Sequence, residues 1–150
     1  MPSNSIVFFI SKRVIILKKR GIMSNQPKGE LAIRTLAMPA NTNVNGDIFG
    51  GWIVSQMDLA GLYVAKRHVR HKIVTVSIQG MDFISPVSVG DFVCCYVDVI
   101  KQGTTSLHVN IETWALGSSP SDYRKVTEGC FVYVAIDQEG KPEALRQPSE

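Results

Sequence analysis

One long apolar segment, followed only by β-like sequence, constrains the fold of this chain most strongly. Between Ile48 and His68 the apolar residues would cover most of the circumference of a helix, and they are Phe49, Trp52, Ile53, Met57, Ala60, Leu62, Tyr63 and Val64. A helix that is apolar on nearly all sides is stable only when it is buried. The sequence therefore predicts one buried helix.

The sequence on both sides of this helix predicts strands. Residues 72–84 alternate around Val74, Val76 and Ile78, and the sequence SPVSVGD then supplies the Pro, Gly and Asp of a turn. Three more strands are predicted after that turn, at residues 92–102, 104–116 and 123–140. A strand at 30–38 precedes the helix and ends at a proline. Consecutive strands with short turns between them predict an antiparallel meander.

These elements predict one α+β domain with the hot-dog arrangement, in which an antiparallel sheet of about five strands curls around one long central helix. The chain has 150 residues, 45% of them hydrophobic and 19% charged, which is the balance of a single folded domain. We expect an N-terminal extension at 1–29, a hot-dog domain at 30–140 and a C-terminal tail at 141–150. Such folds commonly pair through their sheets, so a homo-oligomer is expected.

The first residues resemble a targeting segment but lack its pattern. In SIVFFISKRVIILKKRGI, residues 5–22, Lys12 and Arg13 divide the apolar residues into two runs, each shorter than the roughly 20 residues that span a bilayer. A secretory signal would place its basic residues before the apolar run, whereas the strongest basic cluster here follows it. We expect no stable membrane span. Residues 1–22 are expected to lie upstream of the natural start or to form a mobile extension, with Met23 opening a polar leader.

Charge and cysteine usage exclude two classes of function. The formal net charge is +3 and much of the basic excess lies in the first twenty residues, so the domain has no basic face for nucleic acid. The cysteines and histidines lack metal-ligand spacing, and they are Cys94, Cys95, Cys130, His68, His71 and His108. We expect buried free thiols, no metal, no cofactor, and a reducing, cytoplasmic location.

Three segments together resemble the hot-dog acyl-CoA thioesterases, particularly the YciA-like acyl-CoA hydrolases. They are NTNVNGDIFGGWIVSQMDLAG, VTVSIQGMDFISPVSVGD and CCYVDVIKQGTTSLHVNIETW, and the likeness covers residues 30–138. The resemblance implies hydrolysis of acyl-CoA to free CoA and a carboxylic acid, and a catalytic aspartate at the head of the central helix. It also implies a site between two protomers, in a dimer or in a hexamer built from dimers.

The residues at the head of the helix suit that chemistry. Thioester hydrolysis needs a base for water and hydrogen-bond donors for the carbonyl oxygen. Asp47 is the candidate base, and the backbone N–H groups of Gly50 and Gly51 are the candidate donors, because the first N–H groups of a helix lack partners within it. The alternative, purely structural roles are that Asp47 is the helix N-cap and that the glycines serve close packing.

Binding of the CoA portion is predicted less directly. Asn45, Lys101 and Thr104 are the candidate substrate-binding residues, although Thr104 stands where many relatives have Arg or Lys. Lys66, Arg67 and Arg124 are alternative sources of positive charge. Gln79 stands at a position that is often acidic in the family. Asp58 and Asp91 are expected to be structural, as a paired helix carboxylate and a turn residue.

Two other functions fit the same fold. A non-catalytic acyl-CoA binding or sensing module would usually carry a further partner domain, for which this chain has no room. A hot-dog hydratase or dehydratase depends on a catalytic histidine, and no histidine lies near the head of the predicted helix. Hydrolysis of acyl-CoA therefore remains the predicted activity.

Overall fold

The computed structural model describes residues 6–10, 13–17 and 26–146. Strands β1 (Ile6–Ile10) and β2 (Arg13–Leu17) pair antiparallel as a two-stranded sheet of their own. Residues 1–5, 11–12 and 18–25 of the expected extension lie outside the described residues, as do residues 147–150 of the expected tail. The proposed boundaries of extension, domain and tail stay predictions.

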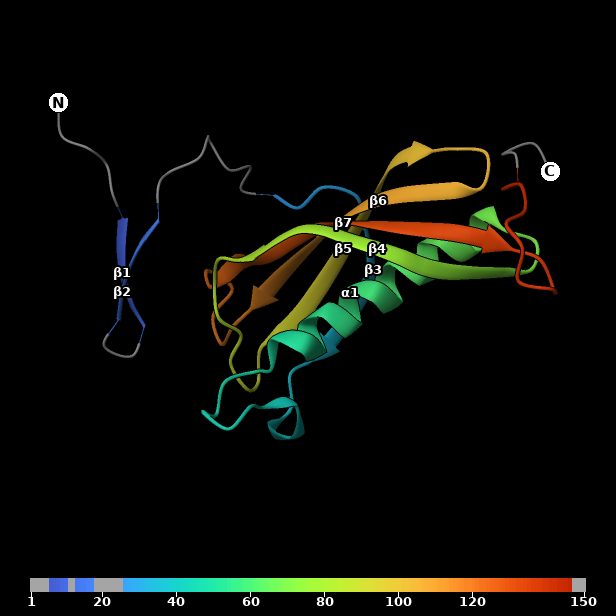
Figure 1. Cartoon of the computed structure of the whole chain (residues 1–150). Coiled ribbons are helices and arrows are strands. Elements are labelled where there is room, and N and C mark those ends of the chain that lie inside the picture. Colours follow the sequence, from blue (N-terminus) through green and yellow to red (C-terminus); the bar gives the residue numbers. More distant parts are fainter. Residues whose placement is uncertain (1–5, 11–12, 18–25, 147–150) are drawn as a thin grey trace, which may run out of the picture.

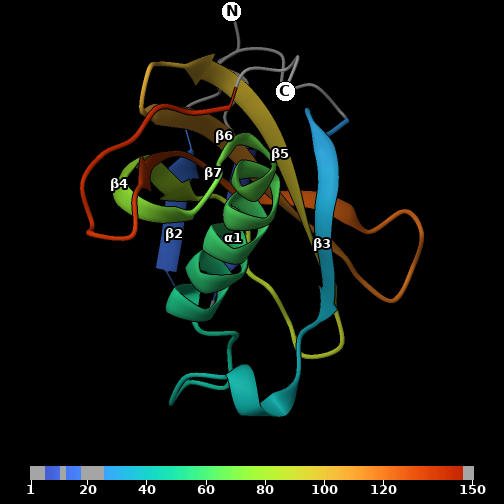
Figure 2. The same cartoon turned by 90° about the vertical axis from the view of Figure 1, so that its right-hand side faces the viewer.

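The rest of the chain forms a five-stranded antiparallel sheet with one long helix against it, which confirms the α+β hot-dog prediction. The elements are β3 (Glu30–Leu36), the short 3-10 turn η1 (Pro39–Asn41), α1 (Gly50–Ala65), the 3-10 turn η2 (Lys66–His68), β4 (Lys72–Phe83), β5 (Phe92–Gln102), β6 (Ser106–Leu116) and β7 (Tyr123–Ile136). Two perpendicular views show α1 lying across the concave side of the curled sheet (Figures 1 and 2). No helix among the described residues is long and apolar enough to cross a membrane.

The predicted meander is right for three strands and wrong for β4. The sheet order is β3-β5-β6-β7-β4, so β4 pairs with β7 and not with β5, the next strand along the chain. Residues 84–91, which we term the crossover loop, therefore lead from β4, at one edge of the sheet, to β5, next to the opposite edge. The reason is that α1 spans the sheet and leads the chain from β3, at one edge, to β4, at the opposite edge (Figure 2).

The helix is buried on one side only. Its inward side chains, among them Ile53, Met57, Ala60 and Val64, are at most 2% exposed and form the core with the inner faces of the strands. Its outward side is apolar but open, since Leu59 is 51% exposed and Tyr63 is 59% exposed. Within one chain, the predicted burial of the helix is therefore confirmed for its inward side only. One curled sheet can cover only one side of a helix.

A polar contact fixes α1 on the sheet. Asp58 of α1 accepts hydrogen bonds at Oδ1 from the hydroxyls of Thr75 (2.7 Å) and Tyr133 (3.1 Å). Burial and the neighbouring Asp58 raise the pKa of Tyr133, so its hydroxyl stays protonated and donates. Gly61 leaves room for that hydroxyl, because a Cβ there would lie 2.0 Å from it. Asp58 thus has the structural role predicted for it.

The cysteines are free thiols in the described part of the chain. Cys94 and Cys95 are buried and Cys130 is partly buried. Burial raises the pKa of Cys95 to about 11, so this thiol stays protonated at neutral pH. Within the same residues no group of three or more His, Cys, Asp and Glu side chains is arranged to hold a metal ion.

Candidate active site

The loop before α1 is held in shape by Asn43. Its side-chain Oδ1 accepts the backbone N–H groups of Asn45 (2.9 Å) and Asp47 (3.2 Å), and its own N–H donates to the carbonyl of Asp47 (2.7 Å). Gly46 has a φ of +83°, in the left-handed region that glycine adopts without strain. The backbone of Asp47 is therefore fixed. Sequence analysis did not single out Asn43, although asparagine before a glycine turn is a usual signal for such a bond.

Asp47 is not the cap of the helix. The N-cap position belongs to Phe49, which makes no side-chain capping hydrogen bond. Ile48 and Phe49 separate Asp47 from the helix because Ile48 is buried in the core, where its N–H donates to the carbonyl of Val87 (3.3 Å). The Asp47 side chain is exposed and makes no hydrogen bond or ion pair with the described residues. The capping alternative is wrong, and the carboxylate is free for another role.

Two N–H groups at the start of α1 lack acceptors within the described part of the chain. The carbonyl of Phe49 accepts the N–H groups of Trp52 (3.0 Å) and Ile53 (3.3 Å), but those of Gly50 and Gly51 donate to no acceptor among the described residues. Both groups lie at the positive end of the helix dipole. A carboxylate without a partner among the described residues thus precedes two adjacent donors of the same kind by only a few residues.

Two aromatic rings flank these glycines. A Cβ at Gly50 would make ordinary contact with the ring of Phe83, at 3.6 Å, whereas a Cβ at Gly51 would meet the ring of Phe49 at 2.5 Å. The space beside Gly51 is therefore filled by Phe49 itself, so close packing explains that glycine in part. The rings of Phe49 (56% exposed) and Phe83 (48% exposed) give the head of the helix an apolar surround.

The predicted substrate-binding residues are not brought together within one chain. Asn45 is exposed in the same loop as Asp47. Lys101 and Thr104 are exposed near the β5–β6 turn, where the carbonyl of Thr104 accepts the N–H of Leu145. The next residue, Arg146, donates to the carbonyl of His68, beyond the C-terminal end of α1. A helix of 16 residues is about 24 Å long, so Thr104 lies far from Asp47.

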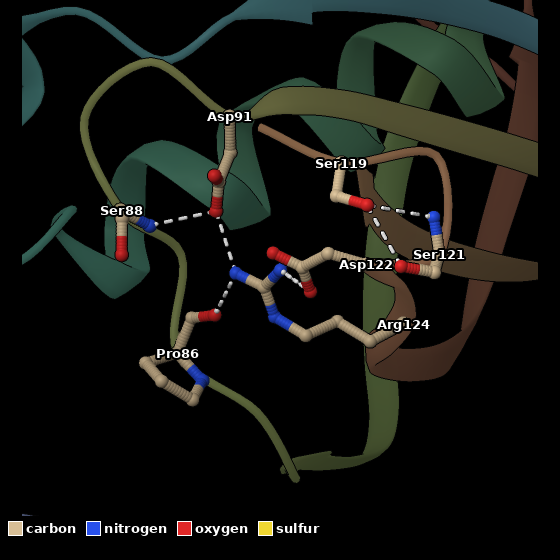
Figure 3. Close-up of polar contacts among 7 residues, drawn as sticks. All are labelled: Pro86, Ser88, Asp91, Ser119, Ser121, Asp122 and Arg124. Carbon is tan, nitrogen blue, oxygen red and sulfur yellow. Dashed lines mark hydrogen bonds and ion pairs between the residues drawn. The ribbon is translucent and has the colours of Figure 1, made fainter. Parts of the chain in front are cut away.

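Two of the alternative basic residues form ion pairs with carboxylates. Arg124 pairs with Asp91 through Nη2 (2.6 Å) and with Asp122 through Nη1 (2.7 Å), as Figure 3 shows. Arg67 pairs with Glu30 and lies over the ring of Tyr63, 5.8 Å from its centroid. The positive charge of Arg124 is therefore balanced by two carboxylates of its own chain. Lys66 is exposed directly after α1.

Comparison with known proteins identifies the family. Residues 45–119 match the thioesterase superfamily. The acyl-CoA thioester hydrolase YciA of Salmonella typhimurium is 55% identical over 126 residues, which are 82% of this chain and 95% of that protein. The chain belongs to the YciA acyl-CoA thioester hydrolases of the thioesterase superfamily. The family resemblance and the enzyme class predicted from the sequence are thereby confirmed.

Solved structures similar to this YciA-family chain include two hexameric enzymes. The thioesterase y2039 from Yersinia pestis is 51% identical, with a TM-score of 0.76, over 82% of this chain and 100% of that chain. HI0827, a broad-specificity acyl-coenzyme A thioesterase, is 45% identical, with a TM-score of 0.77, over 83% of this chain and 86% of that chain. HI0827 has also been solved as an aspartate-to-alanine mutant.

Proposed function

We propose that this chain hydrolyses acyl-CoA thioesters with Asp47 as general base and the N–H groups of Gly50 and Gly51 as donors to the thioester oxygen. The observation that carries the proposal is that, among the residues the structure describes, neither the carboxylate of Asp47 nor the first two N–H groups of the helix that follows it have a partner. A helix start without partners is costly unless water or a ligand satisfies it. Here the ligand is the thioester carbonyl.

The chemistry follows from these groups. Asp47 accepts a proton from a water molecule, and the water oxygen attacks the carbonyl carbon. Negative charge then develops on the carbonyl oxygen, where the N–H groups of Gly50 and Gly51 stabilise it. The C–S bond breaks as the tetrahedral intermediate collapses, and the CoA sulfur leaves as a thiolate, which takes up the proton that Asp47 accepted from water. The products are free CoA and a carboxylic acid, and the proposed mechanism uses no metal or cofactor.

We propose further that the site is completed by a second copy of the chain. The outward side of α1 exposes Leu59 and Tyr63, and the edge strand β4 exposes Val76 (55%) and Ile78 (43%), so two neighbouring surfaces are apolar and open. Hexameric relatives support association of this chain as a dimer or hexamer.

The position of the predicted CoA-binding residues agrees with a shared site. Lys101 and Thr104 lie at the far end of the helix from Asp47, and in this proposal a second copy brings its own Lys101 and Thr104 to the CoA bound at Asp47. Asn45 shares the loop of Asp47 and contacts the substrate within the same copy. In this proposal the acyl chain lies along the apolar surfaces between the copies.

The activity is tested with a panel of acyl-CoAs of increasing chain length and a thiol reagent that reports free CoA. We expect thiol release that depends on the protein and yields equal amounts of acid and CoA. Reactions without protein give the background rate. Tight binding without thiol release would support the sensing module instead, and reversible hydration of an enoyl-CoA without release would support a hydratase.

We expect activity to depend on association. Light scattering and activity are measured together over a dilution series, and the activity per chain should fall in step with the mass of the assembly. The physical reason is that a single chain lacks one wall of the acyl site and the Lys101 and Thr104 that a second copy would bring to Asp47. A fully active monomer would refute the shared site and leave the hydrolytic activity of the chain intact.

A further inference from the structure

We propose that Arg124 and Asp91 are positioning residues for Asp47, acting through the crossover loop at residues 84–91. This inference rests on the catalytic role proposed for Asp47. Neither residue is required to touch the substrate. Together they fix the loop against which the segment carrying Asp47 is hydrogen bonded.

Arg124 holds the crossover loop at two points. Its Nη2 donates to the carbonyl of Pro86 (3.1 Å) and to Oδ2 of Asp91 (2.6 Å), and the same Oδ2 accepts the N–H of Ser88 (2.9 Å). Figure 3 shows the guanidinium of Arg124 between these groups. Asp91 is only 6% exposed, so its charge-assisted bonds form largely out of water. The two points of attachment lie on either side of Val87.

Val87 connects this clamp to the active-site loop. Its side chain is 2% exposed in the core, and its carbonyl accepts the N–H of Ile48, the residue directly after Asp47. The end of the crossover loop is tied to the chain after β3, because Ala37 donates to the carbonyl of Asp91 (2.9 Å) and accepts from Gly90 (2.8 Å). A shift of the loop would therefore move Ile48, and with it the carboxylate of Asp47.

The expected consequence is a loss of rate and not of binding. A misplacement of about 1 Å, caused by a mutation away from the reacting atoms, can cost up to about 10²-fold in rate. Arg124 is occupied by Asp91 and Asp122, so its replacement removes no proposed contact with CoA. The rate constant kcat should fall while KM stays nearly unchanged.

The first test compares Arg124→Lys with a matched control. Lysine keeps the charge but lacks the planar fork that bridges Pro86, Asp91 and Asp122. We expect kcat of the folded variant to fall about tenfold, with KM within about twofold of wild type. Asp122→Asn removes the exposed carboxylate on the other side of Arg124 and leaves the crossover loop untouched, so its kcat should stay within about twofold of wild type. An unchanged kcat in folded Arg124→Lys would overturn the proposal.

A double-mutant cycle distinguishes positioning of Asp47 from a general structural effect. In the Asp47→Asn background there is no base to position, so Arg124→Lys should lower the residual kcat less than about twofold. An equal fall in both backgrounds would overturn the inference. Near-normal turnover of Asp47→Asn alone would overturn the proposed mechanism itself, whereas impaired Asp47→Asn beside normal Arg124→Lys would overturn only the role of Arg124.

Asp91→Asn tests the same proposal if Arg124→Lys does not fold. Asparagine keeps an acceptor for the N–H of Ser88 and removes the charge that holds Arg124. We expect about a fivefold fall in kcat, again lost in the Asp47→Asn background. A folded Asp91→Asn variant with wild-type kcat would overturn the proposal.

Discussion

Replacing Asp47 with asparagine should lower turnover at least about 100-fold, because general-base assistance is typically worth about 10²- to 10⁴-fold. Asparagine has nearly the same size and cannot accept the proton of water. The structure also predicts how the substitution affects stability. The Asp47 side chain caps nothing and has no partner among the described residues, so the melting temperature should hardly change. Steady-state kinetics on the best acyl-CoA and thermal unfolding of the same preparation measure both effects.

Asp98→Asn provides a control for this prediction. Asp98 lies on β5, and its side chain makes no hydrogen bond or ion pair with the described residues. The same chemical change there should leave turnover within about twofold of wild type. If folded Asp47→Asn hydrolyses the best substrate within about threefold of wild type, far short of the general-base effect, the catalytic assignment is wrong.

The elements of the fold were predictable because their signals are local. Alternation around Val74, Val76 and Ile78 identified β4, and the apolar run after Ile48 identified α1. The partner of β4 was not predictable in this way, because residues 84–91 have the composition of a tight turn and form a crossover. Strand order depends on where α1 leads the chain, which no local pattern records.

The burial of α1 likewise depends on information that the local sequence pattern does not contain. Its sequence is apolar around most of the circumference, yet Leu59 and Tyr63 remain exposed in one chain. The pattern correctly indicates that these side chains are suited to burial. It cannot tell whether the covering surface belongs to the same chain or to a second copy.

The candidate site was found through its motif, while its local geometry was not. The sequence identified Asp47, Gly50 and Gly51, but the position of the helix cap depends on burial of Ile48 and its bond to Val87, almost forty residues later. Capping by Asp47 was the alternative because aspartate is a common N-cap residue. Because tertiary packing buries Ile48, the helix begins at Gly50 with Phe49 as its N-cap, and the carboxylate of Asp47 has no capping role.

The partners of the basic residues were not predictable for a related reason. A positive charge in the sequence gives no information about its partner, and the carboxylate of Asp91 lies 33 residues from Arg124 along the chain. Only the folded chain shows that Arg124 holds the crossover loop. The separation of Lys101 and Thr104 from Asp47 is likewise visible only once the helix lies between them.

The largest effect on stability is expected from Gly61→Ala. A Cβ at this position would lie 2.0 Å from the hydroxyl of Tyr133 and 2.8 Å from Cδ1 of Ile111, both in the core. Either α1 moves away from the sheet or Tyr133 leaves its hydrogen bond to Asp58. Overpacking and a lost buried hydrogen bond together should cost about 3 kcal/mol. For a domain of this size the melting temperature should fall by about 10 °C.

Two further variants decide whether that contact is the cause. Gly50→Ala adds the same methyl group to the same helix, where it meets only the ring of Phe83 at an ordinary 3.6 Å, so the unfolding free energy should change by less than about 1 kcal/mol. Adding Tyr133→Phe to Gly61→Ala removes the oxygen that the new methyl group meets, so part of the lost stability should return. Thermal and urea unfolding measure all of these variants. A melting temperature of Gly61→Ala within about 2 °C of wild type would show that the sheet yields at Tyr133 without cost, and would contradict the view that Gly61 sets how closely α1 approaches the sheet.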